Sequence, residues 1–131
     1  MNARAYYQSL QSAIHAAPHV LRSDVRFEEI DINECYVSGV LLLMGSFELH
    51  IAEYVVTDPV LTRLKYRYHL QTADGRLVIR WDNAAHHPTV STFPHHRHDE
   101  QEDIHPAPPM SVLDALTGNT IRVVSSNHDE S

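Results

Sequence analysis

Apolar residues near the start of the chain recur at intervals of three and four positions. Tyr6, Leu10 and Ile14 fall on one side of a helix with this spacing, and Pro18 ends the pattern. The pattern predicts an amphipathic N-terminal helix, and we expect its apolar side to cover a sheet.

From Val25 onward the period changes to two, which is typical of strands. A more apolar strand is predicted over 36–44. Gly45-Ser46 indicates a tight turn into a third alternating strand that begins at Phe47. These segments predict antiparallel strands that follow one another as a meander.

The clearest local element is a hairpin. Two alternating segments, 62–72 and 76–83, flank Asp74-Gly75, a dipeptide that favours a type I′ turn. If this dipeptide forms the turn, Tyr68 lies opposite Trp81 on an apolar face that a helix can cover.

The other face of the predicted hairpin is charged. The same register places His69 opposite Arg80 and Arg67 opposite Asp82. Side chains alternate along a strand, so Lys65 extends this charged face. The hairpin is therefore expected to be apolar behind and charged in front.

Beyond Asn83 the periodicity disappears and prolines become frequent, which predicts a long loop. Ser111 is a candidate cap for a short last helix that runs to Leu116. The predicted fold class is α+β: an N-terminal helix, an antiparallel meander of about five strands and a short C-terminal helix. We expect one domain over 1–124 and a disordered tail over 125–131.

Composition adds a contrast between the whole chain and one segment of it. The net charge of −7 over 131 residues argues against attraction to nucleic acid as a bulk property. Between Arg63 and Arg80, however, the only acidic residue is Asp74. A local basic surface can therefore exist on an acidic body.

Three features of the sequence bear on the cellular location of the protein. The longest apolar run, 36–44, is too short to cross a bilayer, and no charged-then-apolar leader is visible. Cys35 is the single cysteine, so no internal disulfide can form. We expect a soluble, cytoplasmic protein that does not contact a membrane.

Histidine is far more frequent than usual, with 11 in the chain. The clustered histidines are His86, His87, His95, His96, His98 and His105. Their segment leaves the strand that carries Arg80 and Asp82, so we expect it to fold back over the charged face. Histidine exchanges protons near neutral pH and arginine binds phosphate with paired hydrogen bonds, a combination typical of phosphodiester cleavage.

In this hypothesis one histidine is the general base on a ribose 2′-hydroxyl, a second protonates the leaving oxygen, and Arg80 holds the phosphate. Asp82 or Glu53 could orient an imidazole, and Tyr66 and Tyr68 could stack on bases, although the register puts both rings on the apolar side. The candidate catalytic residues are His86, His87, His95, His96, His98 and Asp82. The candidate substrate-binding residues are Arg80, Lys65, Arg67, His69, Asn83, Tyr66 and Tyr68.

Structural explanations for the same residues stay open. Arg67 and Asp82 could form a simple cross-strand ion pair, and Asn83 could hold the strand exit. The histidine pairs could also do no more than order their loop by hydrogen bonds. Each of these alternatives requires the side chain to be engaged within the protein.

Metal binding is a further alternative, because several imidazoles in one loop could capture zinc or nickel. No recognised ligand spacing supports it, and His95-His96-Arg97-His98 is too compressed for one tetrahedral site. We therefore expect no metal and no other cofactor. A metal-binding regulatory module stays as an alternative.

Three motifs follow one another in the second half of the chain. They are Lys65-Tyr66-Arg67-Tyr68-His69 with Gly75, Arg80-Trp81-Asp82-Asn83, and His86-His87 followed by Pro94-His95-His96-Arg97-His98. This arrangement resembles the signature of the TumE family, the toxin components of TumA/TumE-type toxin–antitoxin systems. The resemblance includes Gly45-Ser46 and the strand leading to Glu53, and it covers most of 25–99.

The resemblance implies a growth-inhibiting toxin that is neutralised by an antitoxin with a helix-turn-helix DNA-binding domain. Ribonuclease activity is our extrapolation from the histidine chemistry. We therefore expect a bacterial type II toxin that is a metal-independent ribonuclease with RNA as its substrate, and a homodimer stays open. The alternative in a different class is a non-catalytic toxin that inhibits a cellular protein by binding.

Overall fold

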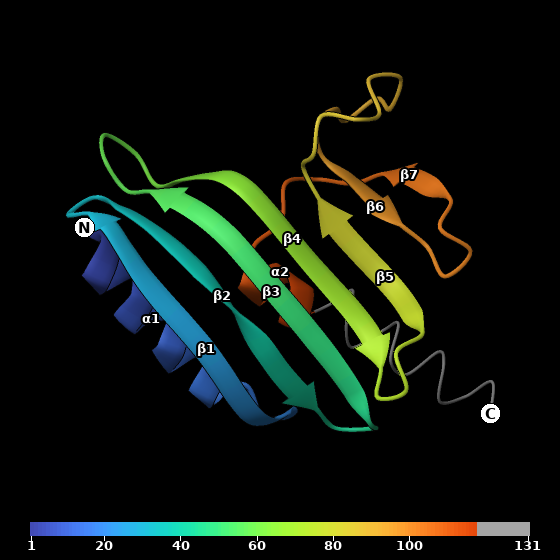
Figure 1. Ribbon diagram of the computed structural model, residues 1–131, viewed down its shortest axis with the longest axis horizontal. Helices are drawn as coiled ribbons and strands as arrows, with labels where there is room; N and C mark the ends of the chain where they lie inside the picture. The colour runs from blue at the N-terminus through green and yellow to red at the C-terminus, as the bar shows by residue number, and fades with distance from the viewer. Residues whose placement is uncertain (118–131) are drawn as a thin grey trace.

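The computed structural model describes residues 1–117 and contains one sheet of seven antiparallel strands in sequence order (Figure 1). The helices are α1 (Ala3–Ala16) and α2 (Val112–Leu116). The strands are β1 (Val20–Asp31), β2 (Glu34–Leu43), β3 (Phe47–Val56), β4 (Thr62–Thr72), β5 (Leu77–Asp82), β6 (His96–His98) and β7 (Ile104–Pro106). The predicted α+β class and the meander are confirmed, although the sheet has seven strands rather than about five.

Both helices lie behind the same face of the sheet, and no helix within residues 1–117 covers the other face, called the open face below (Figure 1). Tyr6, Leu10 and Ile14 of α1 are buried, as their spacing predicts. Burial along β3 alternates residue by residue between buried and half-buried positions. Trp81 of β5, only 1% exposed, belongs to the same core. Each strand therefore directs one set of side chains to the helices and the other to the open face.

The predicted pairing of β4 with β5 is confirmed, with Tyr68 opposite Trp81. The predicted type I′ turn is wrong. That turn needs a positive φ at both central residues, whereas Gly75 (φ 93°) has one and Asp74 does not. The amide of Gly75 donates to the carbonyl of Thr72 at 2.9 Å, and a bulge at the end of the ladder restores the register.

The segment predicted as a structureless loop contains two further strands. β6 adds to the edge of β5, and β7 adds to β6. The acidic run between them forms a turn in which the Asp99 carboxylate accepts the amides of Gln101 and Asp103. Three-residue strands are too short to show a period, and the neighbouring prolines hide them.

The predicted cap of the last helix is confirmed, and the first helix also begins at a capping residue. Asn2 caps α1, and Ser111 forms a capping box with Asp114 at the start of α2. Neither helix has the length and hydrophobicity needed to span a bilayer. The predicted tail over 125–131 lies outside the described residues.

Candidate functional site

Two rows of directly opposed residues cross the open face of the sheet. Opposed residues in antiparallel strands point to the same face, so the pairing alone brings distant positions together. The first row, from β3 to β6, is Ala52, Arg67, Asp82 and His96. The second row is His50, His69, Arg80 and His98.

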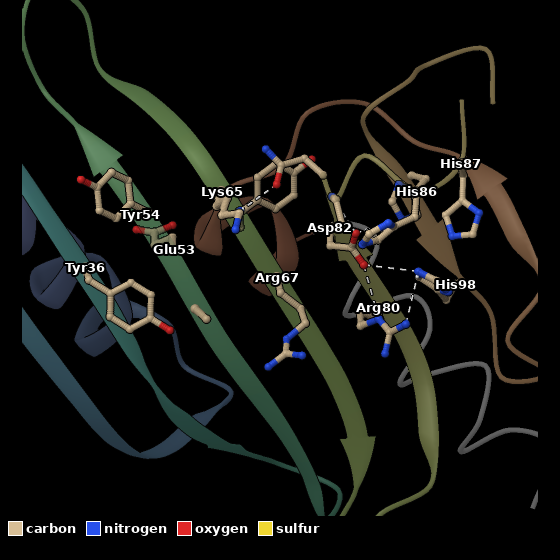
Figure 2. A pocket seen from close by; sticks show the side chains of 15 residues that line it. Tyr36, Glu53, Tyr54, Lys65, Arg67, Arg80, Asp82, His86, His87 and His98 are labelled. Atoms are coloured by element: carbon tan, nitrogen blue, oxygen red, sulfur yellow. Dashed lines mark hydrogen bonds and ion pairs between the residues drawn. The ribbon is translucent and has the colours of Figure 1, made fainter. Parts of the chain in front are cut away.

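A pocket of about 580 Å³ lies over the first row and over the Arg80 and His98 end of the second (Figure 2). The loop that leaves β5 forms one side of it, and β2 and β3 form the other. The small side chain of Ala52 leaves room at its floor. Its polar lining includes Tyr36, Tyr54, Lys65, Arg67, Arg80, Asp82, Asn83, His86, His87, His96 and His98.

Asp82 is the charged centre of the pocket. Its Oδ1 lies 2.9 Å from Nε2 of His96, and its Oδ2 lies 3.3 Å from Nε2 of His98. Nε of Arg80 is 3.4 Å from Oδ2. The carboxylate is largely buried, so these contacts are little screened by solvent. One aspartate thus orients two imidazoles and one guanidinium.

The two imidazoles differ in their second partners. Nδ1 of His96 donates to the carbonyl of Pro94 at 2.8 Å, which leaves Nε2 facing the pocket. Nε2 of His98 accepts a hydrogen bond from Nη2 of Arg80 at 3.3 Å. Burial and then the Arg80 guanidinium lower the pKa of His98 below its usual value. His98 therefore presents a neutral ring at neutral pH.

Two cations on the pocket wall are available to a ligand. Lys65 and Arg67 line the pocket, and neither takes part in an ion pair within residues 1–117. The predicted pairing register of Arg67 with Asp82 is confirmed, but the Asp82 carboxylate contacts Arg80 and the histidines instead. Both cations can therefore meet an incoming anion.

His86 and His87 come from the loop after β5. His86 is exposed, and His87 is half-buried with its ring centroid 5.0 Å from that of His96 and 5.9 Å from that of His98 (Figure 2). The structure thus brings four of the five predicted catalytic histidines to one pocket, together with Asp82.

His95 does not join them. It is absent from the pocket lining, and its Nδ1 is hydrogen-bonded to the Tyr66 hydroxyl at 2.8 Å. Side chains alternate along the chain, so the residue next to His96 points the other way. Burial raises the pKa of Tyr66 to about 12. We therefore withdraw His95 as a catalytic candidate and assign it a structural hydrogen bond.

The two tyrosines proposed to stack on bases are also unavailable. Tyr66 is 5% exposed and Tyr68 is wholly buried. The Tyr68 hydroxyl donates to Glu53 at 2.5 Å, and Tyr6 of α1 donates to the same carboxylate. Glu53 also lies 3.5 Å from Nε of Arg63, so it orients no imidazole. Both predictions fail because these side chains lie on the core face.

Asn83 and His69 have roles that the sequence left open. The Asn83 amide accepts the Tyr66 N–H at 2.9 Å and donates to the Leu64 carbonyl at 3.1 Å, so it fastens the exit of β5 to β4. His69 lies on the open face opposite Arg80, in the same row, but it does not line the pocket. Asn83 therefore has a structural role at the edge of the pocket.

The pocket has an aromatic wall that the sequence reasoning missed. Tyr36 and Tyr54 are a directly opposed pair on β2 and β3, and Tyr54 is opposed to Lys65 on β4. Tyr36 is 38% exposed, and the Tyr54 hydroxyl donates to Glu34. Extending the register from the hairpin to β2 would have placed both rings on the charged face.

Fold and pocket together define a small α+β protein whose open sheet face carries a histidine-rich, cationic site. A family model described as Toxin TumE matches residues 10–127, which is nearly the whole chain. The chain therefore belongs to the TumE toxin family, as the motifs predicted, and a toxin of this kind implies an antitoxin partner. No curated protein and no solved structure matches the chain.

Proposed function

We propose that this toxin is a ribonuclease and that the pocket on the open sheet face is its active site. The observation that carries the proposal is the convergence of three cations with several imidazoles on one hollow surface. Lys65, Arg67 and Arg80 line the same pocket as His86 and His98. Cations that bind phosphate beside groups that exchange protons are the requirements for cleaving a phosphodiester.

The proposed reaction is an attack by the ribose 2′-oxygen on the adjacent phosphorus. His98 takes the 2′-hydroxyl proton on Nε2, the nitrogen that accepts a hydrogen bond from Arg80 in the free protein, after the Arg80 guanidinium turns to the phosphate. The P–O5′ bond breaks, and a protonated histidine at the pocket mouth, His86 or His87, gives its proton to the leaving 5′-oxygen. Arg80 holds the phosphate oxygens that gain negative charge. The products are a 2′,3′-cyclic phosphate and a 5′-hydroxyl.

The pocket also offers contacts for single-stranded RNA. Tyr36 and Tyr54 provide rings on which unpaired bases can stack, a contact worth about 1–3 kcal/mol per base. Lys65 lies directly opposite Tyr54 and can reach the backbone phosphate of a stacked nucleotide. A single strand laid across β2 to β5 would thus meet rings first and the catalytic cluster second.

The experiment is induction of the toxin alone in bacterial cells, followed by total-RNA integrity. The wild-type chain should stop growth and degrade RNA, and His98→Gln should abolish both at equal protein levels. His105→Gln, which alters a histidine on β7 outside the pocket, should behave as the wild type. Growth arrest with intact RNA would refute the ribonuclease and favour a toxin that blocks a cellular protein by binding.

The finer description of the partner is also a proposal. We infer that the toxin acts in the cytoplasm and that its antitoxin carries a helix-turn-helix DNA-binding domain, supported by membership of the TumE family. Co-expression of the adjacent reading frame should restore growth. A homodimer through the outer edge of β1, which pairs only with β2 among the described residues, would appear as a doubled mass in solution.

A further inference from the structure

We propose that His87, His96 and His98 form a binding site for a divalent transition-metal ion of the Zn²⁺ class. One ring nitrogen of each histidine lies within 4.8 Å of the others. Two of the rings come from β6 and the third from the loop before it. This convergence of three imidazoles is the observation on which the inference rests.

The spacing argument against a metal does not hold in the folded chain. Histidines two apart on a strand point to the same side, so β6 presents His96 and His98 together and turns Arg97 away. His87 supplies the third nitrogen from outside the strand. Only His96 and His98 of the compressed motif would therefore bind the ion, and the third ligand comes from outside the motif.

The hydrogen bonds of His96 are those of a metal ligand. Its Nδ1–H is fixed on the Pro94 carbonyl, which leaves the Nε2 lone pair directed into the pocket. Ligating histidines characteristically donate their second N–H to a carbonyl or carboxylate in this manner. Nε2 also lies 2.9 Å from Oδ1 of Asp82, a contact that either a proton or a metal ion on Nε2 makes favourable.

The surroundings also fit a divalent ion. Asp82 contacts two of the three rings and supplies the negative charge that offsets the metal. His96 and His98 are buried, so their side chains lose little conformational entropy when a metal binds. His87 is half-buried on a loop and must become more ordered. Three nitrogens bound to one tetrahedral Zn²⁺ at about 2.0–2.1 Å lie about 3.3–3.4 Å from one another, so the loop must close toward β6.

The donor set selects the metal. Three neutral imidazoles suit Zn²⁺, Ni²⁺, Co²⁺ or Cu²⁺, whereas Mg²⁺ and Ca²⁺ require oxygen ligands. Binding of Zn²⁺ must therefore depend on these three histidines, and Mg²⁺ must not bind in its place.

The test uses the full chain, purified without a histidine tag and stripped with a chelator. Calorimetric titration with Zn²⁺ should show one tight site, and titration with Mg²⁺ should show none. His87→Gln, which removes a ligand from the loop without entering the core, should weaken the site by more than about tenfold. His98→Gln should do the same, and His105→Gln is the matched control that should bind as the wild type.

Co²⁺ gives a second readout that does not depend on activity. The wild type should develop the visible absorption of Co²⁺ bound to imidazoles, and His87→Gln should lose it while retaining the wild-type circular dichroism spectrum. Equal Zn²⁺ binding by the wild type and His87→Gln, or equal losses in His87→Gln and His105→Gln, would overturn the site.

A consequence for regulation rests on the ribonuclease proposed above. A metal at these nitrogens occupies the lone pair with which His98 would accept the 2′-hydroxyl proton, so Zn²⁺ should suppress RNA cleavage and a chelator should restore it. Activation by Zn²⁺ would contradict this consequence. If the stripped protein cleaves no RNA, the ribonuclease fails, and calorimetry alone still decides the metal site.

Discussion

At the scale of single residues, the pocket is organised by Asp82. Its carboxylate touches His96, His98 and Arg80, and Oδ1 also accepts the backbone N–H of Ala84 at 3.0 Å. A buried carboxylate with this many partners is held in one position. The groups around it are consequently preorganised before any ligand arrives, which is what electrostatic catalysis requires.

In the proposed mechanism, phosphate binding depends most directly on Arg80. Arg80→Ala should lower RNA cleavage by roughly 10²-fold, the cost typical of removing one preorganised donor to a developing charge. Cells should then tolerate the toxin. Activity is measured as the initial rate of cleavage, and thermal unfolding verifies that the variant folds.

Arg76→Ala is the matched control for that substitution. Arg76 is an exposed arginine beside the hairpin turn, and its side chain is 79% exposed. Its removal should leave cleavage unchanged. If Arg80→Ala kept wild-type toxicity while folding normally, the phosphate-binding role of Arg80 would be wrong.

The sequence predicted the sheet face of a residue well where the alternation of side chains along a strand alone decides it. Arg80 and Asp82 lie on the open face because they are two apart on β5, and Trp81 between them lies in the core. Tyr68 and His95 were chosen as site residues for the chemistry of their side chains, although their positions along the chain place both on the core face. Tyr36 was missed because its strand was interpreted as uniformly apolar.

At the scale of elements, a buried polar network joins α1 to the sheet. The Glu53 carboxylate on β3 accepts the hydroxyls of Tyr6 on α1 and Tyr68 on β4, and Arg63 lies beside it. Burial, followed by the Glu53 charge, raises the pKa values of both tyrosines, so both hydroxyls stay protonated donors. This network positions the helix over the strands behind the pocket.

Tyr68→Phe tests the network. Removing one hydroxyl from a buried carboxylate should lower the free energy of unfolding by roughly 1.5–3 kcal/mol. Tyr36→Phe, which removes a hydroxyl from an exposed ring, should change it by less than about 0.5 kcal/mol. Urea denaturation measures both, and equal small effects would show that the network contributes little to stability.

The row that crosses β4 and β5 makes stability depend on pH. His69 faces Arg80 and His50, and Arg67 lies on the same strand. Burial, followed by the charges of Arg80, His50 and Arg67, lowers the pKa of His69. The unfolded chain therefore binds a proton at a higher pH than the folded chain, so His69 favours folding above pH about 6.5 and loses that effect as the pH falls.

His69→Gln should accordingly reduce the acid sensitivity of the fold. Unfolding free energies of the wild type and the variant, measured by urea denaturation at pH 7.5 and at about pH 5.5, should differ less with pH in the variant. The other histidines contribute equally to both proteins and cancel in the comparison. An unchanged or larger pH dependence in His69→Gln would contradict the assigned direction.

The elements that sequence patterns predicted are the long ones. α1 and β1 to β5 each present enough residues for a period to be recognised, and the Asp-Gly hairpin fixed the register of the strands beside it. β6 and β7 have three residues each, and their pairing is determined by the edge of β5 rather than by their own pattern. The fold-back of the histidines was predicted, but its form as strand addition was not.

At the scale of the whole molecule, charge is distributed unevenly. The net charge of −7 disfavours long-range attraction of RNA, whereas the pocket gathers Lys65, Arg67 and Arg80 on one open face. The two helices occupy the opposite face and leave this surface free (Figure 1). The proposed ribonuclease would therefore recognise RNA locally, through a few phosphates and the bases stacked between them.

The most direct test of the account is cleavage of a short single-stranded RNA by the purified, chelator-treated toxin, compared with the same RNA carrying 2′-O-methyl groups. The proposed attack by the 2′-oxygen predicts cleavage of the unmodified RNA to 2′,3′-cyclic phosphate ends and none of the methylated strand. Cleavage of both strands, or of neither, would contradict the proposed active site.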